Sequence, residues 1–202
     1  MNFSEFSFWW ILLLFCVPFF TVRFVGQVLN LWRNVFDSVG IAALSLLLFF
    51  NASATSFVVF LVQILFNYWM VQWMITRPPQ QEKLIATMLI VFDVVVLVYF
   101  KYLTFFVEDI LGLAILVPGN WRSQFPLPVF GGIPPGVSFY TFQMVAFVVD
   151  SLKARRKKPI EFMDYVNFVS FFPQIVAGPI ERRSALLPQI SSFRFKFTAD
   201  NW

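Results

Sequence analysis

Histidine does not occur among the 202 residues of this chain, and cysteine occurs once. The lone Cys16 excludes an intrachain disulfide and a cysteine-rich metal site, so we expect no metal-ligating cluster. Charge is scarce, because 13% of the residues are Asp, Glu, Lys or Arg, against about a quarter in soluble domains. The basic residues lie at the ends of apolar runs, which is a membrane pattern and does not indicate nucleic acid as a partner. The composition therefore predicts an integral membrane protein.

Uncharged runs divide the first part of the chain into membrane segments. Phe6 to Val22 nearly crosses a hydrocarbon core of ~30 Å at about 1.5 Å per residue, and it is the first predicted span. Arg23 to Asp37 is predicted to be an interfacial segment. Ser38 to Thr76 carries no charge and is too long for one helix, so a break at Asn51 to Ser53 should separate two antiparallel spans.

A fourth span follows after a proline-rich turn. Arg77 should end the preceding helix, because a residue before proline disfavours the α conformation, and a polar turn through Lys83 comes next. Leu84 to Phe100 is the predicted span. Glu108 and Asp109 mark its exit, and Leu111 to Ile133, rich in proline and glycine, is predicted to be a loop.

The stretch from Pro134 to Ile190 is the most informative. Two apolar segments, Gly136 to Val149 and Tyr165 to Ile180, flank a charge-dense turn from Asp150 to Asp164, so the pattern folds back on itself. Proline and glycine interrupt the second segment and release backbone groups, which in a bilayer must be buried in protein or face a water-filled cavity. The interrupting residues are Pro173, Gly178 and Pro179. This stretch is therefore predicted to be buried in protein or to line a cavity rather than to face lipid.

The basic residues also predict an orientation. They follow the first, third and fifth apolar segments, and they all fall on one side if the N-terminus is extracytoplasmic. They are Arg23, Arg33, Arg77, Lys83, Lys153, Arg155, Arg156, Lys157 and Lys158. The predicted fold is all-α: a single multi-pass membrane domain over residues 1–202, with five or six crossing or re-entrant segments and broken helices.

Polar and charged residues inside or next to the apolar runs have structural interpretations, and some also have a functional one. Asp93, near the centre of the fourth span, is a pocket residue or a carboxylate paired with a neighbouring helix. Gln63 and Asn67 share one helix face and favour interhelical hydrogen bonds. The basic run from Lys153 to Lys158 attracts an anionic ligand or acidic lipid, or it only sets the topology.

Several separated motifs resemble one known family. They are Pro135 to Gln143 (PGVSFYTFQ), Phe171 to Gln174 (FFPQ), Ala177 to Arg182 (AGPIER) and Leu187 to Gln189 (LPQ). In this order they look like the membrane-bound O-acyltransferase family, and within it the bacterial alginate O-acetyltransferase branch. The resemblance implies O-acetylation of an extracytoplasmic polysaccharide, such as alginate, at the bacterial inner membrane. It also implies partners: an acyl donor (acetyl-CoA or another acyl carrier), a polysaccharide acceptor, membrane lipid and other O-acetylation or secretion components.

The motifs and the re-entrant pattern together suggest which residues line a tunnel for the donor. These candidates are Ser138, Thr141, Gln143, Asp150, Gln174, Glu181 and Arg182. Serine and threonine in membrane helices also bond to their own backbone, so a purely local role stays open for Ser138 and Thr141. No bound cofactor is expected.

The resemblance assigns catalysis to a histidine, and no histidine is present. Thr198 to Trp202 is typical of a helix N-cap and first turn, so we expect the chain to be the N-terminal part of a longer enzyme whose histidine lies beyond Trp202. The chain should then be inactive alone. The alternatives are a non-catalytic membrane scaffold or partner subunit, and a transporter-like protein.

Overall fold

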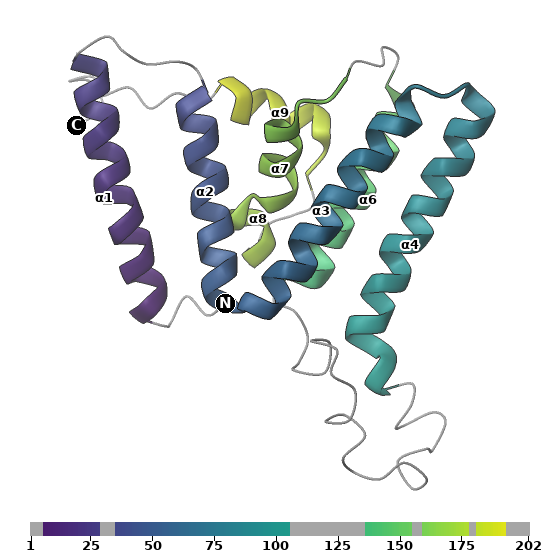
Figure 1. Ribbon diagram of the computed structural model, residues 1–202, viewed down its shortest axis with the longest axis horizontal. Helices are drawn as coiled ribbons and strands as arrows, with labels where there is room; N and C mark the ends of the chain where they lie inside the picture. Colours follow the sequence, from purple (N-terminus) through teal and green to yellow (C-terminus); the bar gives the residue numbers. More distant parts are fainter. Residues whose placement is uncertain (1–5, 29–34, 106–135, 155–158, 178–180, 193–202) are drawn as a thin grey trace, which may run out of the picture.

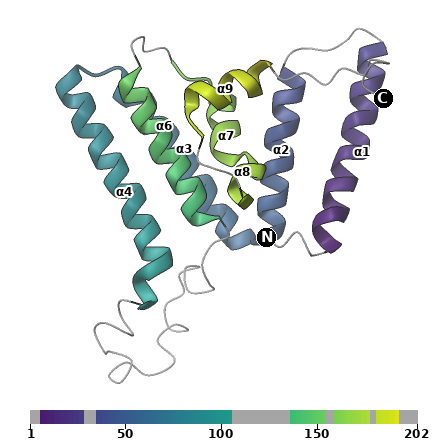
Figure 2. The same ribbon diagram turned by 180° about the vertical axis from the view of Figure 1, so that it is seen from behind.

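The computed structural model describes residues 6–28, 35–105, 136–154, 159–177 and 181–192, and its secondary structure over these residues is helical. Figure 1 shows the first helices in chain order and Figure 2 shows the same bundle from behind. The predicted all-α fold is therefore confirmed. The predicted loop from Leu111 to Ile133, the residues Glu108, Asp109 and Arg33, the basic residues 155–158, and Thr198 to Trp202 lie outside the described residues.

The first four helices form an antiparallel series. They are α1 (Phe6–Val28), α2 (Val35–Ala52), α3 (Ala54–Ile75) and α4 (Pro79–Phe105). Helices α1, α3 and α4 contain stretches long and apolar enough to cross a membrane, and α2 is a shorter apolar helix. The break at Asn51 to Ser53 is confirmed, since Ser53 caps α3 by accepting a hydrogen bond of 3.3 Å from the N–H of Ser56.

Two boundaries differ from the sequence prediction. The predicted interfacial segment from Arg23 to Asp37 is wrong at both ends, because α1 continues to Val28 and α2 already contains Asp37 in its first turn, while residues 29–34 lie outside the described residues. The polar turn through Lys83 was also wrong. Helix α4 begins at Pro79, a position where a proline lacks only an N–H that a helix start leaves unpaired. Arg77, as predicted, lies beyond the end of α3.

The later helices fill the space between the long ones. They are α6 (Val137–Lys153), α7 (Phe162–Ser170), α8 (Phe172–Ala177) and α9 (Arg183–Ser192). Helix α6 packs against α3 and α4, and α7 packs against α2, α3 and α6 (Figures 1 and 2). The predicted interruption of the apolar segment from Tyr165 to Ile180 is found between α7 and α8, while Gly178 and Pro179 lie outside the described residues. That break lies at Phe171, however, not at Pro173, and sequence reasoning missed α9.

Buried aromatic rings join α6 to its neighbours. Tyr140 packs against Phe49 of α2 and Phe60 of α3, with ring centroids 6.0 and 4.7 Å away. Further along α6, the ring of Phe147 packs edge-on against the ring of Tyr165 of α7, with centroids 4.8 Å apart. All of these rings are at most 1% exposed. The core therefore sits where α2, α3, α6 and α7 meet.

The ends that carry the basic residues lie together. The last turn of α1, the connection between α3 and α4, and the end of α6 are at the same end of the bundle in Figures 1 and 2. This is the arrangement that the positions of Arg23, Arg77 and Lys153 predicted. The start of α1 lies at the opposite end.

Candidate functional site

A buried amide pair connects two of the predicted motifs. Gln143 lies on α6, whose start is set by Gly136 at a φ of 70°, a left-handed conformation that favours glycine. The Nε2 of Gln143 donates to Oε1 of Gln174 on α8 over 2.5 Å. The two side chains are 2% and 7% exposed, so this hydrogen bond is shielded from solvent. Two residues 31 positions apart in the chain are thus brought together, as a shared site requires.

A second junction joins α6 to the start of α9. Asp150 accepts a hydrogen bond of 2.8 Å from the backbone N–H of Arg183. The guanidinium of Arg183 donates to Oγ of Ser151 over 3.0 Å and lies 4.7 Å from the ring centroid of Phe147. This geometry holds the first turn of α9 on α6. Arg183 is therefore fixed in one orientation by groups from α6.

The charges at this junction act on one another. Burial lowers the pKa of Arg183, and the carboxylates of Asp150 and Asp164 oppose that shift. Burial and the charge of Glu161 raise the pKa of the Asp164 carboxyl, against the pull of Arg183. The junction is consequently a partly desolvated group of opposite charges.

A polar cavity of about 880 Å³ opens beside this junction. It lies at the end of the bundle where the basic residues gather, and its lining combines charged and hydroxyl groups with apolar side chains. The lining residues are Asp150, Lys153, Ala154, Arg183, Ser184, Leu187 and Pro188. Exposed Lys153 and fixed Arg183 give it two cations, against the single carboxylate of Asp150. The cavity can therefore accept an anionic group.

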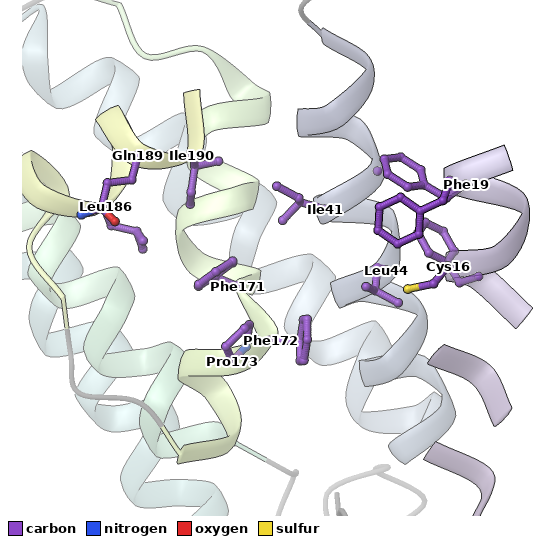
Figure 3. A pocket seen from close by; sticks show the side chains of 13 residues that line it. Cys16, Phe19, Ile41, Leu44, Phe171, Phe172, Pro173, Leu186, Gln189 and Ile190 are labelled. Carbon is purple, nitrogen blue, oxygen red and sulfur yellow. The ribbon is translucent and has the colours of Figure 1, made fainter. Parts of the chain in front are cut away.

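Figure 3 shows a second, apolar cavity of about 350 Å³ between α1, α2, α8 and α9. Phe171 and Phe172 come from the break between α7 and α8, and Cys16 and Phe19 from the opposite wall. A Cβ at Gly40 would collide with the ring of Phe19, so this glycine allows α1 and α2 to approach closely. The cavity offers space for an alkyl chain but few polar groups.

The remaining tunnel candidates are not gathered at one place. Thr141 is buried, and its hydroxyl has no hydrogen-bond partner among the described residues, while Ser138 is half-buried. Glu181 is half-buried and Arg182 is exposed, just before α9, and neither lines the two cavities above. Gln143 lines neither cavity as well. The tunnel therefore remains a prediction.

The structure also places polar residues that sequence reasoning left out or left open. Arg23 and Asp37 form a buried ion pair. Asn167 of α7 donates to Ser38 of α2 over 2.7 Å. Asp93 accepts a hydrogen bond of 2.8 Å from Nδ2 of Asn67, as the paired-carboxylate interpretation and the predicted interhelical role of Asn67 require. The sequence did contain a signal for the pair of Arg23 and Asp37, since each residue is a lone charge between apolar runs.

Comparisons with known proteins show which proteins this chain is similar to. It is 29% identical over 151 residues to a peptidoglycan O-acetyltransferase of Helicobacter pylori, which covers 62% of this chain and 27% of that protein. It is 30% identical over 131 residues to a probable alginate O-acetylase, AlgI, of Pseudomonas aeruginosa, with 62% and 24% covered. An AlgI of Azotobacter vinelandii is 30% identical over 105 residues, with 52% and 20% covered.

The curated relatives are O-acetyltransferases, and they confirm the resemblance to the alginate O-acetylase-like branch. The matched part of the chain spans about a quarter of the length of the first two relatives. No family model matches the chain. A search of the solved structures also finds no match.

Proposed function

We propose that this chain is part of a membrane O-acetyltransferase that transfers an acetyl group to a hydroxyl of an extracytoplasmic polysaccharide. The observation that carries the proposal is the sequence similarity to proteins named as O-acetylases of alginate and peptidoglycan. The membrane-length helices agree with it. Alginate and peptidoglycan are the two acceptors that the relatives suggest.

In this reaction the acceptor hydroxyl attacks the acetyl carbonyl of a thioester donor. A general base takes the hydroxyl proton, the thiolate leaves and is protonated, and an ester forms. The chain contains no histidine to serve as that base. Its contribution is therefore binding and positioning. The base is supplied from outside these 202 residues.

The polar cavity at the α6–α9 junction is the proposed place for the anionic part of the donor. Lys153 is exposed there, and hydrogen bonds to Ser151 and Asp150 hold Arg183 at the wall of the cavity. A phosphate-bearing carrier such as coenzyme A offers the charge that these cations attract. The basic residues 155–158 follow directly in the sequence and add to the attraction.

A chimera tests this function. The chain replaces the aligned segment of the P. aeruginosa relative in cells that lack their own O-acetylation enzyme, and acetyl ester on exported alginate is measured. We expect ester with the chimera, much less with its Lys153→Glu variant, and none with the 202-residue chain alone. A chimera present in the membrane at normal amounts but without ester contradicts the proposal. Ester from the chain alone contradicts the requirement for a histidine.

We further propose that the end of the bundle carrying Lys153 faces the cytoplasm, with the N-terminus outside, in the bacterial inner membrane. Cys16→Ser removes the only cysteine, and single cysteines are then introduced at Ala154 and, as a matched control at the other end of the bundle, at exposed Asn51. A membrane-impermeant maleimide added to intact cells should label Asn51→Cys and spare Ala154→Cys. The opposite labelling pattern would reverse the topology.

A further inference from the structure

The apolar cavity in Figure 3 separates α1 from α8 and α9. Its volume is about 350 Å³, and none of the residues that line it is charged. Gln189 of α9 carries the one amide group in this lining, and its Nε2 donates to the carbonyl of Ala185 over 3.0 Å. That donor is therefore turned back onto its own helix. The cavity offers an entering molecule an almost entirely hydrocarbon surface.

Both walls of the cavity are anchored on α2. On one side, the buried ion pair between Arg23 and Asp37 ties α1 to α2. On the other side, the N–H of Phe172 donates to Oγ of Ser45 on α2 over 3.3 Å, which holds the start of α8. Helix α2 itself contributes Leu44 to the lining. The cavity is thus bounded by contacts that belong to the fold.

The cavity extends in the direction that a lipid tail takes in a bilayer. Leu186 and Ile190 of α9 lie at one end of it, and Phe171 and then Phe172 lie progressively further from α9 (Figure 3). Helix α9 is at the end of the bundle where the basic residues gather, and α8 lies nearer the middle (Figures 1 and 2). The opposite wall, α1, contains a membrane-length apolar stretch of which 11% is buried. In a membrane, hydrocarbon therefore surrounds α1 beside the cavity.

Neither water nor empty space suits a cavity of this kind. A buried water needs two to four polar partners, and an apolar cavity of about 150 Å³ already stays dry and takes up apolar molecules. An empty cavity would leave the surrounding rings and alkyl groups without dispersion contacts on one side. An alkyl chain supplies those contacts and brings no polar group that would need a partner. The lining therefore favours a hydrocarbon occupant.

We propose that this cavity binds one acyl chain of a bilayer phospholipid, which fills the space between α1 and the region of α8 and α9. Because the lining carries no charge, the site recognises the chain and not the headgroup. The lipid completes the packing of α1, whose direct helix contacts are mainly with α2. It is not a reactant, so this inference stands apart from the acetyl transfer proposed above.

The test is native mass spectrometry of the purified chain after extraction from liposomes into mild detergent. We expect one phospholipid to stay bound per chain, equally with phosphatidylglycerol and phosphatidylcholine. Leu44→Trp places a larger side chain in the cavity and should lose this lipid. Leu47→Trp is the matched control, since Leu47 is an exposed residue of α2 outside the lining, and it should keep the lipid. Adding phospholipid to the delipidated chain should raise its unfolding temperature by about 2 °C or more, except in Leu44→Trp.

A second measurement uses the unchanged chain, so it does not depend on the folding of Leu44→Trp. A phospholipid with a photoreactive diazirine in the middle of one acyl chain should attach to Cys16, Phe171 or Phe172 in liposomes, as mapped by peptide mass spectrometry. A chain that retains no lipid, a lipid that survives in Leu44→Trp, or the absence of attachment to the cavity wall overturns the proposal. Retention of one headgroup only also overturns it, and so does a second copy of the chain cross-linked in place of lipid.

Discussion

The ion pair between Arg23 and Asp37 should be among the strongest single connections of α1 to the rest of the bundle. The Nε of Arg23 lies 2.8 Å from Oδ1 of Asp37, and its Nη2 donates to Oδ2 over 3.1 Å. The two residues are only 9% and 2% exposed. Removing one partner leaves the other charge buried, which costs about 3–5 kcal/mol. At about 2–4 °C per kcal/mol for a chain of this size, Asp37→Leu or Arg23→Met should lower the unfolding temperature by about 6–20 °C.

Replacing both partners tests the reasoning. The double variant with Arg23→Met and Asp37→Leu removes both charges, so it should recover most of the stability that each single variant loses. A residual loss of about 0.3–1 kcal/mol is expected, because Asp37 also lies in the first turn of α2, where a negative charge favours the helix. Thermal unfolding of the four proteins in the same detergent gives the coupling energy. A coupling energy below about 1 kcal/mol would refute the claim that the pair acts as a buried unit.

Two further predictions concern the later helices. Gln143→Leu should lower the unfolding temperature more than the double variant with Gln143→Leu and Gln174→Leu. The single change leaves the Gln174 amide buried without its partner, which costs about 1–3 kcal/mol. Equal losses in the two variants would contradict the pairing. Asp164 has a raised pKa when folded, so its contribution to stability is full below its ordinary value near 3.8 and is lost as pH rises through the folded-state pKa. Asp164→Asn should therefore flatten the fall in unfolding free energy above about pH 4, and an unchanged pH profile would disprove this assignment.

Much of the fold could be predicted because charges, prolines and short polar breaks mark helix ends. The break at Ser53 and the stop at Arg77 both follow from local sequence. The end of α1 could not be predicted in this way, because the charge of Arg23 is compensated by a residue 14 positions away. A solitary arginine such as Arg23 is then taken for the end of a membrane span although it lies inside a helix. Long-range pairing therefore limits what charge patterns indicate.

The break between α7 and α8 teaches a related point. Pro173 is the second residue of α8, where a proline fits a helix start, so the chain breaks before the proline and not at it. The N–H of Phe172 donates to Oγ of Ser45 on α2 over 3.3 Å. The sequence predicted that freed backbone groups need partners, but it could not identify Ser45. The same is true of the candidate site, where Gln143 and Gln174 were both selected but their contact was not foreseen.

Gln72 of α3 has a consequence for the order in which the molecule assembles. Its side-chain amide donates to the carbonyl of Ile160 over 2.5 Å and accepts from the N–H of the same residue over 3.3 Å, so it pairs with that residue as a neighbouring strand would. Helix α3 is synthesised 88 residues before this partner. The short helix α7, which follows Ile160, can then pack against α3 after α3 has entered the membrane. It does not need to insert by its own hydrophobicity. Loss of Gln72 should accordingly appear as misinserted chains during biosynthesis more than as early melting of correctly assembled ones.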